Sequence, residues 1–243
     1  MREIVLDTET TGFDPEQGDR LVEIGAIELV NHMPTGRTYH QYVNPGRDMP
    51  QSAFEVHGIG PDLLDPPRGA TPGEVTLRDK PVFASVGQAF LDFIGDAKLV
   101  IHNAAFDMKF LNAELGWASL GQISWGQAID TLDMARRKYP GSPASLDALC
   151  RRFNIDNTAR TLHGALLDSE ILAEVYLELI GGRQPGLVLS NAAADQTTVA
   201  DQTWRPKPRQ RPLRPRLTPA EKDAHTAFVE TLGADALWKT LGA

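Results

Sequence analysis

Residues 4–12 read IVLDTETTG, an apolar run that ends in two acidic side chains. The apolar run predicts a buried strand, in which residues two apart point to the same face. Asp7 and Glu9 are therefore expected side by side, where carboxylates repel unless a cation lies between them. Oxygen ligands suit Mg²⁺ or Mn²⁺ rather than Zn²⁺. The alternative is that both acids are solvated charges at a strand end.

A second acidic position follows another short strand signal. Leu99-Val100-Ile101 runs into HNAAFD, residues 102–107, and a helical pattern follows. Asp107 is thus expected in the first turn of a helix beside the sheet. The helix dipole favours a carboxylate there with or without a metal, so this position alone does not separate a metal ligand from a structural acid.

A third motif, RTLHGALLDSE at residues 160–170, supplies a group that titrates near neutrality. If both were helical, His163 and Asp168 would lie about 140° apart around the axis. Gly164 instead predicts His163 in a loop or first turn, with Asp168 inside a helix from Ala165 to Ile180. A single histidine is more often a partly buried polar group. Together with the three acids, however, the pattern predicts a magnesium-dependent nuclease.

The chain resembles the 3′–5′ exonucleases that carry four acidic residues, in the subclass that uses histidine. Within that subclass it is similar to the epsilon proofreading subunits of bacterial DNA polymerase III. LDTETTG, VHGI, HNAAFD and LHGALLDSEILAEVYL follow in the expected order over nearly all of residues 1–182. The spacing of His163 and Asp168 separates this subclass from relatives with tyrosine at a shorter spacing. The resemblance implies an α/β, ribonuclease H-like fold.

The same resemblance implies a two-metal mechanism, with ions roughly 3.5–4 Å apart. Asp7, Glu9 and Asp168 would hold the metal that binds the attacking water, and Asp7 would bridge to the second ion. Asp107 would support that second ion, partly through water. His163 would act as general base. The products would be 5′-mononucleotides released from a 3′ end, and a frayed mismatch would reach the site more easily than a paired end.

The candidate substrate contacts are Thr10, Thr11, Gly12, His57, Asn103 and Phe106. The first three form a tight turn whose backbone can approach a nucleotide closely. The ring of Phe106 offers a surface for an unstacked base, although core packing would explain it equally well. His57 in VHGI and Asn103 in HNAAFD are included because they match the family motifs.

The sequence predicts a mixed sheet flanked by helices. Strands are expected at 2–7, 20–30, 36–44, 98–102 and 128–130, and helices at 82–94, 104–115, 131–138, 145–153 and 164–181. Residues 65–80, rich in proline and glycine, exceed the usual length of the family and predict a surface loop or disordered insertion. We favour a tolerated insertion over a contact with substrate or a partner. Cys150 lies on an apolar stripe and is expected to be a buried thiol in a reducing compartment.

The formal net charge is −8, which is unusual for a protein that grips DNA on its own. Six basic residues crowd into residues 205–216, so the rest of the chain has 18 basic against 32 acidic residues. Weak binding to duplex DNA is therefore expected, with a larger partner delivering the substrate. The start has no signal peptide and no segment could span a membrane, so a cytoplasmic protein is expected.

The predicted organisation is a nuclease domain at 1–182, a flexible linker at 183–217 and a partner-binding tail at 218–243. Gln184, Leu187 and Leu189 resemble a peptide that binds the sliding clamp, although plain linker is an equal alternative. Thr218-Pro219-Ala220-Glu221 has the pattern of a helix start. The resemblance implies that the tail binds the polymerase catalytic (alpha) subunit, and leaves open a small accessory subunit.

Two alternative functions remain at this point. One is a stand-alone exonuclease of the same fold that acts on RNA ends or repair intermediates. The other is a scaffold that ties polymerase to clamp and has an inactive nuclease domain. The long tail argues against the first, and the complete set of acids with His163 argues against the second.

Overall fold

A computed structural model describes residues 1–158, 162–181, 217–233 and 238. The chain divides into two units, Met1–Val188 and Leu189–Ala243, which are described separately below. The linker predicted over 183–217 lies outside the described residues except for its last position. The predicted clamp peptide, with Gln184, Leu187 and Leu189, lies wholly outside them.

The first unit is built on one mixed sheet of five strands in the order β3-β2-β1-β4-β5. The strands are β1 (Arg2–Thr10), β2 (Leu21–Val30), β3 (Met33–Tyr42), β4 (Lys98–Ile101) and β5 (Ala128–Asp130). β1, β2 and β3 pair antiparallel, whereas β4 runs parallel to β1 and β5 parallel to β4. The predicted α/β fold with a mixed sheet is confirmed.

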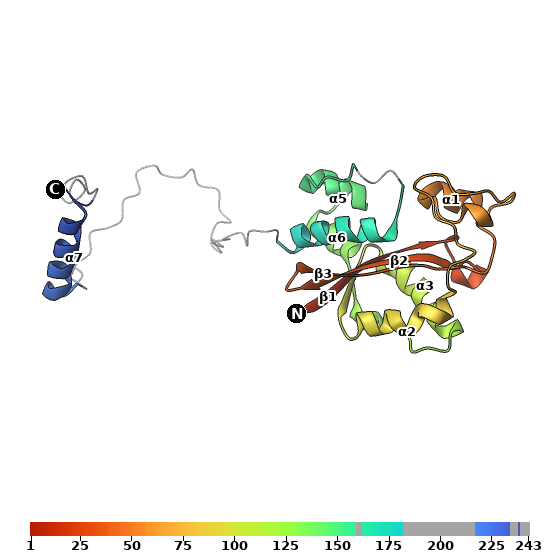
Figure 1. The fold of residues 1–243 in the computed structure, drawn as a ribbon, viewed down its shortest axis with the longest axis horizontal. Coiled ribbons are helices and arrows are strands. Elements are labelled where there is room, and N and C mark those ends of the chain that lie inside the picture. The colour runs from red at the N-terminus through yellow and green to blue at the C-terminus, as the bar shows by residue number, and fades with distance from the viewer. Residues whose placement is uncertain (159–161, 182–216, 234–237, 239–243) are drawn as a thin grey trace. The chain divides into compact units, whose positions relative to one another are not determined.

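Helices cover both faces of this sheet, with α2 and α3 on one side and α5 and α6 on the other (Figure 1). The helices of this unit are α1 (Gln51–His57), α2 (Phe83–Ile94), α3 (Ala104–Trp117), α4 (Thr131–Lys138), α5 (Leu146–Phe153) and α6 (Ala165–Ile180). Short 3₁₀ helices occur at Pro15–Gln17, Pro61–Leu63 and Trp125–Gln127. Every predicted element is present, and α1 is one that the sequence analysis did not predict.

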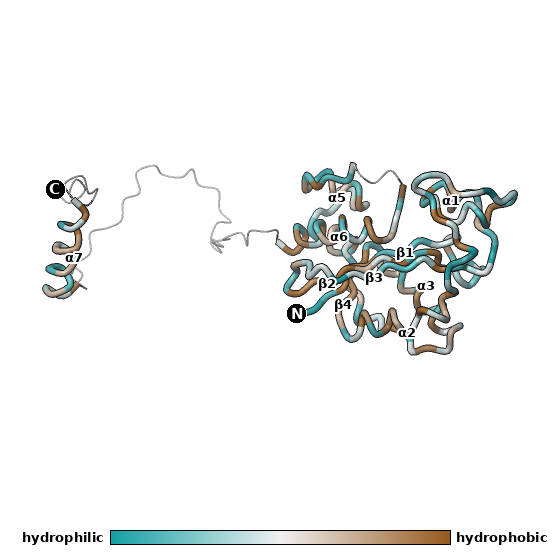
Figure 2. The backbone as a smooth tube through the Cα atoms, viewed as in Figure 1, coloured by the Kyte–Doolittle hydropathy of each residue, from teal (hydrophilic) through white to brown (hydrophobic). Residues whose placement is uncertain are grey.

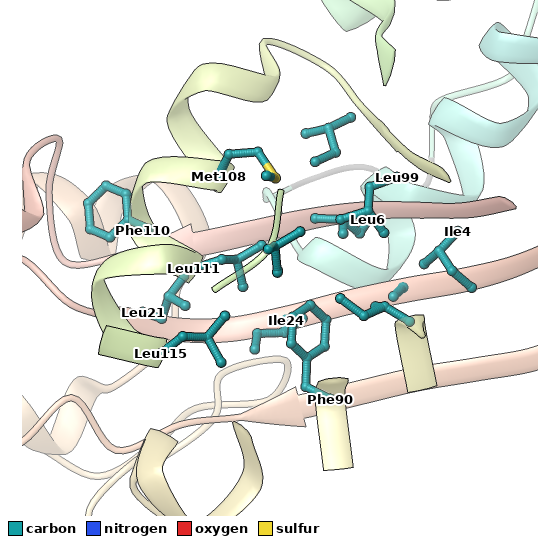
Figure 3. Close-up of a cluster of buried hydrophobic side chains, with 14 of the residues drawn as sticks. Ile4, Leu6, Leu21, Ile24, Phe90, Leu99, Met108, Phe110, Leu111 and Leu115 are labelled. Atoms are coloured by element: carbon teal, nitrogen blue, oxygen red, sulfur yellow. The ribbon is translucent and has the colours of Figure 1, made fainter. Parts of the chain in front are cut away.

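The alternation of side chains along β1 decides which helix each residue meets. Ile4 and Leu6 are fully buried in a cluster with side chains of α2 and α3 (Figure 3). Val5, between them, packs on the other face against Leu172 and Tyr176 of α6. Hydrophobic colour accordingly runs along the central strands, where the layers meet (Figure 2). Asp7 shares the parity of Val5 and therefore belongs to the face covered by α6.

Residues 65–80 form a surface loop that is anchored at both ends, so the disordered alternative is not what the structure shows. Positions 65–73 are exposed, and the chain then returns to the core through Leu77, which is fully buried. Asp62 accepts hydrogen bonds from the backbone N–H groups of Leu77 and Arg78, both at 2.9 Å. The side chain of Arg68 pairs with Glu74 at 2.7 Å.

Two smaller predictions are also confirmed. Cys150 is fully buried and packs with Leu149 and neighbouring side chains of α6. In the second unit, α7 (Pro219–Thr231) begins with a capping box between Thr218 and Glu221. This helix has no buried residue, and none of the helices in the described ranges is long and apolar enough to cross a membrane.

Candidate active site

The predicted catalytic side chains meet in one pocket of about 280 Å³ where β1 and β4 end. Its lining is Asp7, Thr8, Glu9, His102, Asn103, Phe106, Asp107, Ser145, Leu146, Asp147, His163 and Asp168. A larger groove of about 540 Å³ shares His163 and Asp147 with it, so the two hollows adjoin. Residues far apart in the chain thus surround one volume.

The pocket contains donor atoms that fit a divalent cation. One ligand atom each from Glu9, His163 and Asp168 lies within 4.8 Å of the others. Glu9 and Asp168 are buried, and Asp7 and Asp107 line the same pocket. Buried carboxylates this close destabilise one another unless a positive charge compensates them. A set dominated by carboxylate oxygen suits Mg²⁺ or Mn²⁺.

Asp107 lies in the first turn of α3, as predicted, and is almost fully buried. The hydroxyl of Thr8 donates a hydrogen bond to its Oδ1 at 2.7 Å. Burial raises the pKa of Asp107 to about 7, and the negative charge of Asp130 adds to that effect. Thr8 points to the face of β1 that α3 covers, and Asp7 points to the face that α6 covers. The end of β1 therefore lies between Asp107 of α3 and Asp168 of α6, and all of them line the same pocket.

His163 lies just before α6 and Asp168 inside it, which confirms the predicted arrangement. The backbone N–H of His163 donates to the carbonyl of Val56 in α1 at 3.1 Å. Its Nδ1 lies 3.4 Å from Oδ2 of Asp168, and 47% of its side chain is exposed. The histidine is therefore fixed through its backbone while its ring reaches both the pocket and solvent.

Gly25 of β2 allows α6 to lie directly on the sheet. It is the cross-strand partner of Asp7, and a Cβ at this position would lie 2.2 Å from backbone atoms of Ala165 and Leu166. The hydroxyl of Ser169 donates to the Gly25 carbonyl at 2.9 Å. Gly25 was not among the predicted site residues, although a glycine inside a strand often marks a close backbone approach.

Asp130, at the end of β5, holds the helix that carries Asp107. Its carboxylate accepts hydrogen bonds from the N–H groups of Asn103 and Ala104, both at 3.1 Å. The same carboxylate caps α4 through the N–H of Leu132 at 2.8 Å. Asn103 has a left-handed backbone, with φ 66°, and lines the pocket. Asp130 was not among the predicted site residues, because only its strand was recognised.

A smaller, more apolar pocket of about 150 Å³ adjoins the first through Thr8, Glu9 and Phe106. Its apolar walls include Phe13, which is 89% exposed, and Val56. Phe106 is half-buried and lines both pockets, and the centroid of its ring lies 5.0 Å from that of Phe110. Core packing and contact with a ligand are therefore compatible for Phe106. Phe13 was missed, and its signal was an aromatic directly after the predicted turn.

The turn after β1 is held by several buried contacts. Thr10 and Gly12 line the apolar pocket, whereas Thr11 is buried and exchanges hydrogen bonds with the backbone of Arg20. A Cβ on Gly12 would lie 2.3 Å from Oδ2 of Asp19. A side chain at position 12 would therefore have to displace the Asp19 carboxylate from the turn.

His57 lies beneath the same turn and is buried. Its Nδ1 accepts a hydrogen bond from the N–H of Ile59 at 3.0 Å, so Nε2 carries the proton that points to the Thr10 carbonyl at 3.3 Å. Burial lowers the pKa of His57 to about 4. The ring of His57 therefore contacts the turn at the backbone carbonyl of Thr10, and it stays neutral near neutral pH.

Comparison with known proteins agrees with this arrangement. Residues 4–176 match the family described as Exonuclease. The DNA polymerase III subunit epsilon of Rickettsia felis is 46% identical over 96% of this chain and 97% of its own length. The subunit of the same name from Escherichia coli is 46% identical over 75% of this chain and 72% of its own.

A solved structure, exonuclease X in complex with 5′ overhanging duplex DNA, is 25% identical with a TM-score of 0.53. It covers 73% of this chain and 90% of that one. The family match spans the strand and helix ends that build the pocket. The chain therefore belongs to the exonuclease family, among the DNA polymerase III epsilon subunits.

Proposed function

We propose that the protein is the proofreading exonuclease of a replicative DNA polymerase, removing mismatched 3′-terminal nucleotides as 5′-mononucleotides. The observation that carries the proposal is the close approach of Glu9, His163 and Asp168, within 4.8 Å, in a pocket also lined by Asp7 and Asp107. The epsilon subunit of Rickettsia felis, which matches 96% of the chain, supports assignment to replication. Association with that polymerase would place the protein in the cytoplasm.

The carboxylates of Asp7, Glu9 and Asp168 would hold one divalent ion, with Asp7 also reaching a second that Asp107 supports. Bound ions would lower the pKa of the attacking water and neutralise charge that develops on the phosphate. The protein's part is to hold these acids in place, and bound cations would favour the ionised form of Asp107, whose pKa is raised by burial. Neighbouring groups fix the acids: the Thr8 hydroxyl orients Asp107, and the contact between β2 and α6 orients Asp168.

His163 is proposed as the general base that takes a proton from the attacking water. An imidazole titrates near neutral pH, so it can accept a proton and release it within one turnover. The carboxylate of Asp168, 3.4 Å from Nδ1, would stabilise the protonated ring. The exposed part of the ring gives the proton a direct route to solvent.

The apolar pocket beside the acids is proposed to receive the terminal base. Phe13 and Phe106 offer rings against which an unstacked base can rest, and the backbone of Thr10 and Gly12 closes the wall. With a volume of about 150 Å³, this pocket would accept a base only after that base has left its pair. Unpairing costs less at a mismatch, so a frayed mismatched end would enter more often than a matched one.

The proposed partners follow from charge and from the tail. A net charge of −8 predicts weak binding to DNA alone. Residues 183–217 are proposed as a linker, and α7 is proposed to bind the polymerase catalytic subunit through its exposed side chains, among them Phe228 at 61% exposure. Binding of the sliding clamp through Gln184, Leu187 and Leu189 remains a separate proposal.

The experiment that tests the activity compares DNA and RNA oligonucleotides labelled at either end. With Mg²⁺, we expect wild type to release labelled mononucleotide at once from the 3′-labelled DNA and to shorten the 5′-labelled DNA stepwise. EDTA or Asp7→Ala should abolish both signals. Cleavage of RNA alone would instead indicate a ribonuclease, and no cleavage of either would indicate a scaffold.

A further inference from the structure

The helix that carries Asp168 begins without a capping side chain of its own. The residue before its first turn is Gly164, and Ala165, where α6 begins, is fully buried. The first N–H groups of a helix have no partner within the helix, and a Ser, Thr, Asp or Asn usually supplies one. Glycine cannot, so this buried end needs an acceptor from another element.

Glu23 of β2 supplies that acceptor. The N–H of Ala165 donates to its Oε2 at 2.9 Å, and its other oxygen lies 2.6 Å from Nε2 of His40 on β3. The side chain of Glu23 is only 3% exposed. A carboxylate at a helix N-terminus is also favoured by the helix dipole. Glu23 therefore links the start of α6 to β2 and β3.

Ala165 lies between His163, which precedes α6, and Asp168, which lies inside it. His163 is two residues before Ala165, and Asp168 is three residues after it. The N–H of Asp168 donates to the Gly164 carbonyl at 2.8 Å, so both groups belong to the same turn of backbone. A displacement of that turn would move His163 and Asp168 together relative to Glu9.

We propose that Glu23 is a positioning residue of the nuclease site, holding the first turn of α6 so that His163 and Asp168 face Glu9. The inference rests on the proposed function, because its kinetic effect is read from nuclease turnover. Residues that orient metal ligands without touching the ion typically change activity or metal affinity by about 10–100-fold when lost.

The test is a series of substitutions at Glu23 with a matched control on the same strand. Glu23→Leu removes the acceptor and should lower kcat about 10–100-fold with little change in KM. Glu23→Gln keeps an oxygen that can accept from Ala165 and should retain most of kcat. The control is Glu28→Leu, which removes another buried carboxylate of β2, one that pairs with Arg2 and Arg37. That variant should keep kcat.

A second readout needs neither metal nor substrate. Amide hydrogen exchange over residues 163–168 should become faster in Glu23→Leu and stay at the wild-type rate in Glu28→Leu. If Glu23→Leu does not fold, Glu23→Asp serves, because its shorter carboxylate would not reach Ala165. Glu23→Asp should then show both a lower kcat and faster exchange.

Wild-type kcat and wild-type exchange in Glu23→Leu, or in Glu23→Asp if Leu does not fold, would overturn the proposal. An equal loss of kcat in Glu23→Leu and Glu28→Leu would also overturn it, since the effect would then be one of general stability. If wild type itself lacked nuclease activity, the proposed function would fail, while the exchange experiment would still decide whether Glu23 holds α6.

Discussion

Single residues in the site differ most in how far they are open to water. The carboxylates of Asp107 and Asp168 are buried, whereas nearly half of the His163 side chain is exposed. Buried carboxylates are held in position by the side chains packed around them, whereas an exposed ring can pass a proton directly to water. This contrast favours the acids as ligands and His163 as the group that carries the proton.

Replacing His163 with alanine is expected to lower kcat by on the order of 10²-fold or more, because the attacking water loses its base. Mn²⁺ affinity and DNA affinity should be largely unchanged. Single-turnover cleavage of single-stranded DNA, with calorimetric Mn²⁺ titration alongside, measures both quantities. Near-normal turnover would remove His163 from the mechanism, and a parallel loss of Mn²⁺ affinity would make it a ligand instead.

His57 should make folding stability depend on pH. Its pKa is lowered by burial from 6.5 to about 4, so the unfolded chain binds a proton in that interval and the folded chain does not. The contribution to stability is therefore complete above pH 6.5 and is lost as pH falls toward 4. Relative to His57→Gln, the free energy of unfolding of wild type should fall by up to about 3 kcal/mol as pH falls from 6.5 to 4.

Urea unfolding of wild type and His57→Gln at several pH values between 4 and 7 measures this difference. Other titrating groups are common to both proteins, so their effects cancel in the comparison. A stability difference that stayed constant from pH 7 to pH 4 would show that His57 titrates normally in the folded protein.

The side chains proposed to bear the chemistry could be located from sequence because each is itself part of a short motif. Asp7 and Glu9 end an apolar run, and the Gly164 break separates His163 from Asp168. Glu23 and Asp130 could not be located in this way, because they act on backbone N–H groups of distant elements. No local pattern around a strand carboxylate indicates which helix it will cap.

At the scale of elements, the site depends on the contact between β2 and the start of α6. Gly25 brings backbone against backbone there, with no flexible side chain that could move aside. Asp7 is its cross-strand partner, so the distance between β1 and α6 is set at the position of the acids. Any side chain at residue 25 would separate Asp7 from Asp168.

Gly25→Ala is therefore expected to destabilise the protein by about 1–3 kcal/mol and to lower nuclease activity, because α6 must shift away from the sheet. The matched control is Gly116→Ala in α3, where a Cβ would meet only a side-chain atom of Gln122 at 3.8 Å. Urea unfolding and kcat of both variants provide the measurement. Equal behaviour of the two variants would contradict the close-contact argument.

The elements that sequence reasoning placed less well have local physical causes. α1 starts after Pro50 without a capping side chain and has only 7 residues, so no helix signal stood out. β3 begins at Met33 rather than 36, because Asn31 and His32 adopt the left-handed conformation of a tight hairpin turn. Asn31 was the sequence signal for that turn.

At the scale of the whole molecule, the chain contains a compact nuclease unit and a second unit with the helix α7, which has no buried residue. The capping box of Thr218 and Glu221 explains how α7 begins despite its lack of a core. Apart from α1, the strands and α-helices described up to residue 181 were predictable, because the apolar runs and motifs follow one another in the sequence in the same order as these elements. The proposed role of the tail depends on a partner, whose binding surface cannot be read from this chain alone.

Phe228→Asp is expected to weaken binding of the full-length protein to the polymerase catalytic subunit by at least about 10-fold, because it places a charge on the exposed apolar surface of α7. Nuclease activity on single-stranded DNA should not change. The control is His225→Asp, a second exposed position of the same helix. Unchanged polymerase affinity in Phe228→Asp would exclude this side chain from the interface.

Proofreading is measured by the rate at which primer–template DNA loses its 3′-terminal nucleotide, with that nucleotide matched or mismatched. Wild type in Mg²⁺ should remove the mismatched nucleotide faster than the matched one, and Asp7→Ala or EDTA should abolish both rates. Equal rates for the two ends, or removal that continues in EDTA, would contradict a metal-dependent proofreading exonuclease.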